Sequence, residues 1–211
     1  LLFGTFWLEY RLWGDATLGY HVVNVGLHGV GAGLVWAVLR RLRVPGALLA
    51  VAIFALHPVH VESVAWIAEL KNTLSGVFYL ASMLAYLTFD DAGRERRPFG
   101  LWVTSLALFV CAMSSKSVTG SLPAAILVIL WWKRGRLSWR RDVVPLLPFF
   151  VVSAGLGWFT ALYEAQVVGA SGAAFDLSVA ARCLIAGRAF WFYLGKLVWP
   201  VPVVFIYPRW H

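Results

Sequence analysis

The stretch "VPGALLAVAIFALHPVHVESVAWIAELKN", residues 44–72, decides the fold class of this chain. It begins with an apolar run, and two histidines, two glutamates and a lysine follow directly. A helix needs about 20 mostly apolar residues to cross the hydrocarbon core of a bilayer. The stretch therefore predicts a membrane span that ends in a polar cluster, and the chemistry of that cluster is the main question that the sequence raises.

The composition of the whole chain agrees with a membrane protein. Of its 211 residues, 61% are hydrophobic and 13% are charged, whereas soluble domains average about 45–50% apolar and about 25% charged residues. The net charge is +8, but the basic residues lie in short clusters between apolar blocks, which argues against a basic surface for nucleic acid. We therefore predict an all-α, polytopic membrane helical bundle that is surrounded by membrane lipid and has no nucleic-acid partner.

The apolar blocks divide the chain into about six expected spans within a single transmembrane domain, residues 1–211. A seventh helix carries cations among aromatic residues, which is typical of a helix lying at the membrane interface. The expected spans are 20–39, 45–61, 72–89, 99–114, 118–132 and 143–162, and the amphipathic or interfacial helix is 180–198.

Lysine and arginine are concentrated in every second link between these spans. The basic links together contain 11 such residues and are "RRLR" (40–43), "GRERR" (93–97) and "KRGRLSWRR" (133–141). The alternating links contain Lys71 and Lys116. Because cytoplasmic links are enriched in Lys and Arg, the basic links are expected in the cytoplasm and the polar cluster on the extracytoplasmic side. A bacterial inner membrane is the expected location.

Three polar residues share one face of the first expected span. His21, Asn24 and His28 are spaced i, i+3, i+7, which places them along one side of a helix. Polar groups inside a span normally face other helices or a wet cavity, because lipid does not solvate them. The stripe is thus either a hydrogen-bonding seam between helices or a support for a polar cavity near the outer leaflet.

The histidines after the second span lie on either side of Pro58, which predicts a turn or break in the helix. His57, His60 and Glu62 permit three interpretations: a divalent metal site, the wall of a polar site, or a cap in which the histidines bond backbone carbonyls. Glu62 is the carboxylate of this cluster, and it is the local candidate for a general base or a metal ligand.

Two further extracytoplasmic positions carry lysine. Lys71 and Asn72 open the third span, where a lysine extended toward the interface is the simplest interpretation. Lys116 lies in a short turn among hydroxyl side chains. A cation beside hydroxyls and free backbone amides suits a phosphate. The neighbouring hydroxyl residues are Ser114, Ser115, Ser117 and Thr119.

The C-terminal part of the chain adds more candidates on the same side. Arg188 and Lys196 are eight residues apart in the helix 180–198, so they lie on similar faces. They are expected to anchor the helix and to contact an anionic lipid headgroup. Tyr207 and Arg209 follow in "IYPRW" and are expected outside the membrane.

Several of these motifs also carry a family resemblance. The segments "YHVVNVGLHGVGAGLVW", "IFALHPVHVESVAWIAELKN", "SSKSVTGSLPAAILVILWWKRGRLSWRRD" and "IAGRAFWFYLGKLVWPVPVVFIYPRW" resemble the membrane domain of the transmembrane-and-tetratricopeptide-repeat (TMTC) proteins and their bacterial relatives. The likeness covers nearly the whole chain. It implies a C-type glycosyltransferase fold, with the active site on the extracytoplasmic side.

The resemblance also implies substrates and site residues. Such enzymes take a sugar from a polyprenyl-phosphate donor, and the eukaryotic relatives transfer mannose to protein Ser or Thr. By this likeness, a protein acceptor and a polyprenyl-phosphate sugar donor are the expected partners. The implied roles are a site wall for His57, His60 and Glu62, donor-phosphate contact for Lys116, Arg188 and Lys196, and an outer segment for Tyr207 and Arg209.

The chain departs from the family pattern in two places. The catalytic acidic pair of the family lies early in the first outer loop and has no counterpart here, because Glu9 and Asp15 match the later half of that loop. Ser117 stands where family members often have an acidic residue. We therefore expect a fragment that is inactive by itself and a parent protein that is a glycosyltransferase. The alternative is a non-catalytic membrane anchor for a tetratricopeptide-repeat domain.

Overall fold

The computed structural model describes residues 1–92, 98–168, 178–201 and 204. These residues form helices and their links, and no β-strand occurs among them. The all-α fold predicted from the sequence is confirmed. The principal helices are α1 (Leu2–Trp13), α2 (Thr17–Arg41), α3 (Ala47–Leu56), α4 (Val61–Ala65), α5 (Leu70–Asp91), α6 (Phe99–Ser115), α7 (Leu122–Arg134), α8 (Leu147–Tyr163) and α9 (Val179–Val198).

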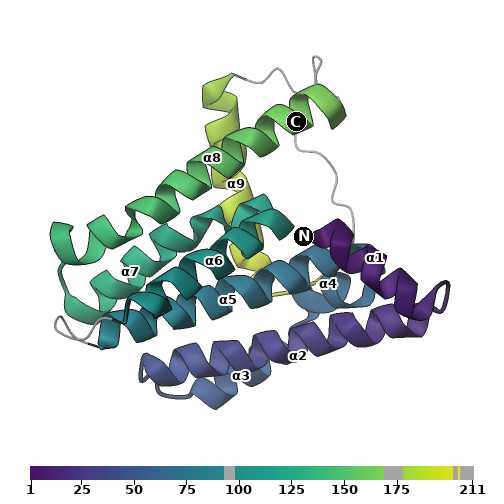
Figure 1. Ribbon diagram of the computed structural model, residues 1–211, viewed down its shortest axis with the longest axis horizontal. Helices are drawn as coiled ribbons and strands as arrows, with labels where there is room; N and C mark the ends of the chain where they lie inside the picture. The colour runs from purple at the N-terminus through teal and green to yellow at the C-terminus, as the bar shows by residue number, and fades with distance from the viewer. Residues whose placement is uncertain (93–97, 169–177, 202–203, 205–211) are drawn as a thin grey trace.

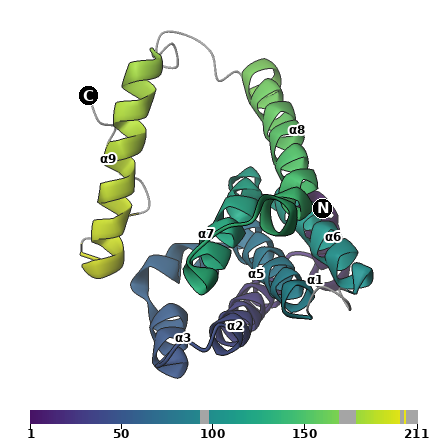
Figure 2. The same cartoon turned by 90° about the vertical axis from the view of Figure 1, so that its left-hand side faces the viewer.

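Helix α5 lies at the centre of the bundle and packs against α2 on one side and α6 on the other. Helix α3 packs beside α2, and α8 crosses over α6 and α7 (Figure 1). Helix α9 stands apart from α8, and its C-terminal end comes near the link between α3 and α4 (Figure 2). The bundle thus has two ends, one where α2, α5 and α7 end and one formed by the links after α3 and α6.

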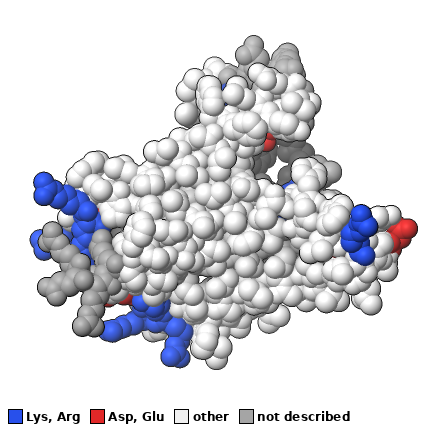
Figure 3. Space-filling view, viewed as in Figure 1, with Lys and Arg blue, Asp and Glu red and all other residues white. Residues whose placement is uncertain are grey.

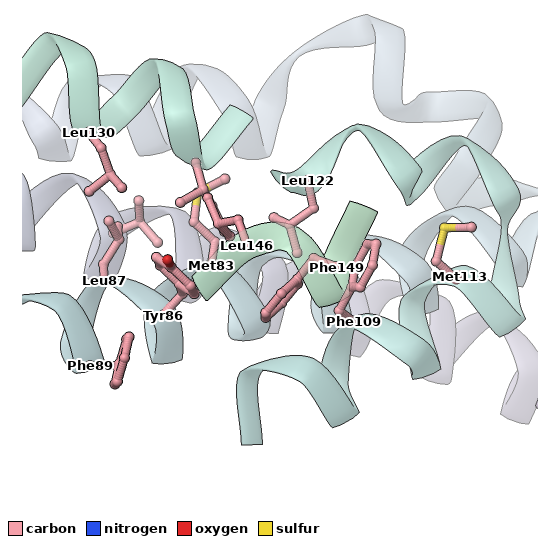
Figure 4. Close-up of a cluster of buried hydrophobic side chains, with 12 residues drawn as sticks. Met83, Tyr86, Leu87, Phe89, Phe109, Met113, Leu122, Leu130, Leu146 and Phe149 are labelled. Carbon is pink, nitrogen blue, oxygen red and sulfur yellow. The ribbon is translucent and has the colours of Figure 1, made fainter. Parts of the chain in front are cut away.

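The apolar core fills the space between α5, α6, α7 and α8 (Figure 4). Phe149 lies at its middle, with its ring centroid 5.7 Å from that of Tyr86 and 5.4 Å from that of Phe109. Helix packing in a bilayer depends on close van der Waals contact and on interhelical hydrogen bonds, because lipid tails are as apolar as the side chains. Ser82 and Ser105 supply such bonds: the hydroxyl of each donates to the backbone carbonyl of the other, at 2.7 and 2.8 Å.

The basic links within the described residues, 40–43 and 133–141, lie at one end of the bundle, where Figure 3 shows blue side chains beside a broad white surface without charge. Asp91 at the end of α5 pairs with Arg41 from the end of α2, at 2.9 Å, and with Lys133 from the end of α7. The three helices therefore end together.

Arg134 is half-buried at this charged end, and its two carboxylate partners are buried. Its two terminal nitrogens donate to Asp90 and to Asp142, whose side chains are 2% and 1% exposed. Asp142 also accepts from the backbone N–H of Ser138 at 2.6 Å. Gly135 ends α7 with φ of +72°, a conformation that glycine adopts without steric cost, so the chain can turn back toward Asp142.

The expected spans correspond to helices with shifted ends. The ranges 20–39, 72–89, 99–114 and 180–198 fall within α2, α5, α6 and α9, while 118–132 is divided between a short 3₁₀ turn (Ser117–Ser121) and α7. Residues Trp139–Tyr163, which contain α8, and α2 are each long and apolar enough to cross a membrane. The pair α3–α4 would be a third such span if the bent pair is one span. The remaining spans stay predictions.

One local feature differs from the expectation, and the break expected at Pro58 is confirmed. The segment assigned to the first outer loop contains a regular helix, α1. The range expected as one span, 45–61, is interrupted after Leu56, and the axes on the two sides of the break differ by 46°. The physical reason for the break is Pro58, which begins a short 3₁₀ turn (Pro58–His60).

Candidate functional site: a polar cavity beside Lys116

The break between α3 and α4 is fixed by His57 and Pro58. A residue before proline is driven away from the helical region, and His57 accordingly has φ of −67° and ψ of 128°. Its Nδ1 accepts the backbone N–H of Val59 at 3.2 Å and so caps the following turn. Chain direction therefore changes at this point, and His60 and Ser63 are brought toward α2 and α5.

The polar stripe of α2 holds this bent segment in place. Asn24 is 1% exposed; its Nδ2 donates to the carbonyl of Trp66 at 3.0 Å, and its Oδ1 accepts from the hydroxyl of Thr73 at 3.0 Å. His28 places Nε2 3.0 Å from the carbonyl of Ala55. Because a carbonyl oxygen only accepts, this nitrogen carries the proton. The stripe is a hydrogen-bonding seam that also positions the wall of a cavity.

Lys116 lies at a second interruption, where α6 ends at Ser115. The backbone of Lys116 is extended, with φ of −157° and ψ of 124°, and a 3₁₀ turn follows. The ammonium group of Lys116 donates to Oδ1 of Asn72, which lies in the first turn of α5. The two residues are 44 positions apart in the chain, so this contact exists only in the folded bundle.

Asn72 connects Lys116 to a small polar network. Its Nδ2 donates to Oε2 of Glu69 at 2.6 Å and to the hydroxyl of Ser63 at 2.9 Å. The other carboxylate oxygen of Glu69 pairs with Lys71 at 3.0 Å. A neutral amide thus lies between the carboxylate of Glu69 and the ammonium group of Lys116.

A cavity of about 470 Å³ opens beside this network, between α2, α5 and the turn after α6. Its polar lining includes His28, His60, Ser63, Asn72 and Lys116. Among the described residues that line it, Lys116 alone carries a full charge. The remaining lining residues are Leu27, Gly31, Phe54, Thr73, Ser75, Gly76, Val77, Tyr79, Leu80, Val118, Thr119 and Ser121.

A second cavity, of about 430 Å³, adjoins the first across His28 and His60, which line both. The rings of His28 and His60 are 5.1 Å apart, and each also lies against Phe54. His21 and His57 line this second cavity, and its other lining residues are aliphatic: Val25, Ala55, Leu56, Val61, Val64 and Ala65.

Two of the three residues proposed as metal ligands, His57 and Glu62, are not placed for that role. His57 uses Nδ1 to accept from Val59, and its Nε2 lies 3.1 Å from the carbonyl of Leu197, so Nε2 carries the proton and neither nitrogen offers a free lone pair. Glu62 lies on α4 and lines neither cavity. Within the described ranges, no group of three or more His, Cys, Asp or Glu is placed to hold a metal.

The predicted site residues are therefore only partly brought together. His28, His60, Asn72 and Lys116 line the first cavity, and His21 and His57 line the second. Five predicted residues of the described chain line neither cavity: Asn24, Glu62, Lys71, Arg188 and Lys196. Arg188 and Lys196 lie on α9, where Lys196 stands 5.6 Å from the ring centroid of Phe192. Tyr207 and Arg209 lie outside the described residues.

Sequence analysis missed residues that complete the network. Glu69 precedes Asn72 by three positions on the approach to α5, and this spacing on a helix was an available signal. Ser63 and Thr73 gave no such signal, because single hydroxyl residues are common in membrane helices. Their roles follow from the break at His57 and from the packing of α2 against α5.

Comparison with known proteins places this chain in a family. The profile of the dolichyl-phosphate-mannose-protein mannosyltransferase family matches residues 5–161. The chain is 44% identical to the protein O-mannosyl-transferase Tmtc1 of Drosophila melanogaster over 114 residues, which are 53% of this chain and 13% of that protein. It is 31% identical to human protein O-mannosyl-transferase TMTC2 over 175 residues, 77% of this chain and 21% of that protein.

The chain thus spans 13% of the length of one of the curated relatives named here and 21% of the other. No solved structure matches it. The family profile, in contrast, covers most of the chain, including α2, the bent α3–α4 segment, α5, α6 and α7. The chain belongs to the dolichyl-phosphate-mannose-protein mannosyltransferase family, and its membrane domain is of the TMTC type.

Proposed function

We propose that this chain is part of a membrane glycosyltransferase and that the cavity beside Lys116 binds the phosphate of a polyprenyl-phosphate sugar. The sugar, mannose in the named activity of the relatives, would pass to a hydroxyl of a protein acceptor on the extracytoplasmic side of a bacterial inner membrane. The observation that supports this function is the single uncompensated cation in a cavity without a carboxylate among its described lining residues.

The proposed reaction has a clear need for such a cation. The acceptor oxygen attacks the anomeric carbon, the bond from that carbon to the phosphate oxygen breaks, and the proton of the acceptor passes to a carboxylate base. The family resemblance places that base in the first outer loop. The departing polyprenyl phosphate gains a second negative charge, so Lys116 would stabilise the transition state more than the bound donor.

The other predicted residues have more limited roles in this proposal. His28 and His60 form the wall between the two cavities, while His57 and Asn24 maintain the bent segment. Contact of Arg188, Lys196, Tyr207 and Arg209 with the donor or with anionic lipid remains part of the proposal, as does the interfacial position of α9.

The test uses the complete parent protein in membranes with radiolabelled polyprenyl-phosphate sugars. Removal of one transition-state donor commonly lowers kcat by roughly 10²–10³-fold, so Lys116→Ala should lower kcat by at least about 10²-fold, and Lys116→Arg should retain part of the activity. Lys133→Ala removes an exposed lysine at the opposite end and is the matched control. Unchanged transfer by Lys116→Ala would overturn the assignment, and a folded protein without transfer from any donor would favour the membrane-anchor alternative.

A further inference from the structure

The partner of Lys116 differs in kind from the partners of the other lysines described in this bundle. Lys133 pairs with the carboxylate of Asp91, and Lys71 pairs with the carboxylate of Glu69, whereas Lys116 donates to the side-chain amide of Asn72. Lys196 is a further case, since it lies over an aromatic ring. A carboxylate neutralises the cation that it binds. An amide oxygen orients the cation but leaves its charge available.

The orientation of the Asn72 amide is determined at both of its ends. An ionised carboxylate can only accept hydrogen bonds, and an ammonium group can only donate them. Nδ2 must therefore face Glu69, 2.6 Å away, and Oδ1 must face Lys116. A rotated amide would direct its NH₂ group at a cation and its oxygen at an anion. The hydroxyl of Ser63, 2.9 Å from Nδ2, also favours the observed orientation when it accepts.

The charges of this network leave one positive charge at the cavity. Lys71 compensates Glu69 at 3.0 Å, the amide of Asn72 is neutral, and Lys116 lines the cavity while Glu69 and Lys71 do not. Glu69 is near enough to orient the amide, and the amide separates it from Lys116.

From this geometry we propose that Asn72 is a positioning residue for the donor-phosphate cation. It holds the ammonium group of Lys116 at the cavity without neutralising it, and Glu69 fixes the amide in the orientation that does so. This inference rests on the proposed function, because it gives Asn72 its role through the contact of Lys116 with an anionic donor.

The experiment measures donor kcat/KM and KM for the complete parent protein in lipid nanodiscs. Asn72→Leu has a similar volume but no acceptor for Lys116, and kcat/KM should fall about 3–10-fold. In the Lys116→Ala background, the same change should cost less than about 2-fold, because the cation that Asn72 positions is already absent. Asn72→Asp places a carboxylate against Lys116, so donor KM should rise at least about 10-fold at pH 8.

The pH profile of Asn72→Asp provides a signature that a structural defect does not share. The new carboxylate would lie beside Glu69, and two adjacent carboxylates tend to share a proton as the pH falls. Lys71 and Lys116 oppose this protonation. Because His28 and His60 also face the cavity and can change its charge with pH, the pH profile of donor KM for each variant is divided by the wild-type profile. The raised donor KM should recover in part between pH 8 and pH 6. Gln166→Glu, the same kind of change at an exposed amide, is the matched control and should not alter donor KM.

The outcomes separate this inference from the function on which it rests. Unchanged kinetics of Lys116→Ala would overturn both. An impaired Lys116→Ala together with wild-type kinetics for Asn72→Leu and Asn72→Asp would overturn the inference alone, as would equal losses from Asn72→Leu with and without Lys116.

If the Asn72 variants do not fold, Glu69→Gln still tests the inference: it keeps the shape of the side chain but no longer dictates the orientation of the Asn72 amide. A fall of about 2–3-fold supports the inference, and no fall overturns it.

Discussion

The cations at the two ends of the bundle have different partners. At the end where α2, α5 and α7 terminate, Arg134 lies between the buried carboxylates of Asp90 and Asp142. At the other end, Lys116 lies beside a cavity and donates to the neutral amide of Asn72. The first arrangement compensates charge and joins helices, while the second leaves charge available to a ligand. Substitution at one end should therefore affect stability, and substitution at the other should affect activity.

The largest effect on stability is expected from Arg134→Ala. The change leaves two carboxylates, 2% and 1% exposed, without their cation, and the loss of one member of a buried ion pair typically costs about 3–5 kcal/mol. The free energy of unfolding in detergent measures the effect. Arg136→Ala, an exposed arginine two positions away, should change it by less than about 0.5 kcal/mol. Equal free energies of unfolding for the two variants would show that the ion pairs of Arg134 do not stabilise the fold.

A smaller loss is expected from Asn24→Ala at the cavity end. Asn24 is 1% exposed and bonds both the carbonyl of Trp66 and the hydroxyl of Thr73. Groups left buried without a partner cost roughly 1–3 kcal/mol each, so the free energy of unfolding should fall by an amount in this range. Val22→Ala, on an exposed side of the same helix, is the control. A loss no greater than that of the control would mean that the polar seam does not stabilise the bent segment.

Glu9 provides a pH-dependent comparison, again at the cavity end. Its carboxylate oxygens are buried and have no hydrogen-bond partner among the described residues, and burial raises the pKa of Glu9 above its ordinary value of 4.5. An acid whose pKa is higher in the folded than in the unfolded protein reduces stability as the pH rises through the interval between the two values. Glu9→Gln should therefore have a higher melting temperature than wild type above pH 4.5, and the difference should vanish below it. A difference that is independent of pH would contradict this account.

The smallest effect on stability is expected from Lys116→Met, which sharpens the comparison most directly. The substitution keeps an unbranched side chain and removes a charge that has no carboxylate partner, so the free energy of unfolding should change by less than about 0.5 kcal/mol. Transfer by the parent protein should nevertheless fall by at least about 10²-fold. A large loss of stability would assign Lys116 to the structural role that Arg134 has at the other end.

The helical bundle could be predicted from the sequence because the underlying signals are local. Apolar blocks, prolines and basic links are read along the chain, and α2, α5, α6 and α9 follow the expected ranges with small shifts. The break at Pro58 was also predictable, since proline restricts its neighbours wherever it stands. Helix α1 was missed because the segment was assigned by its position in an outer loop.

The site was less predictable, because it depends on which side chains meet. His28, His60, Asn72 and Lys116 were selected as polar residues at one end of their spans, and they line one cavity. Arg188 and Lys196 were selected for the same reason, yet they lie on α9 and line neither cavity. Glu62 lines neither cavity. The carboxylate of the described network is Glu69, which orients Asn72, because the break after α3 brings Ser63 to Asn72 while Glu69 lies three positions before it.

By itself, the sequence determined that this chain is a helical membrane domain whose Lys and Arg residues are concentrated in every second link between the expected spans. The reason is that lipid disfavours charge within a span, however the spans pack. Only the tertiary structure decided which charges are neutralised and which remain available. Arg134 meets Asp90 across 44 positions and Lys116 meets Asn72 across 44 positions, so the partner of neither cation could be found from its neighbours in the sequence. The partner is a carboxylate in one case and an amide in the other, and that difference is set by the packing of α5 against its neighbours.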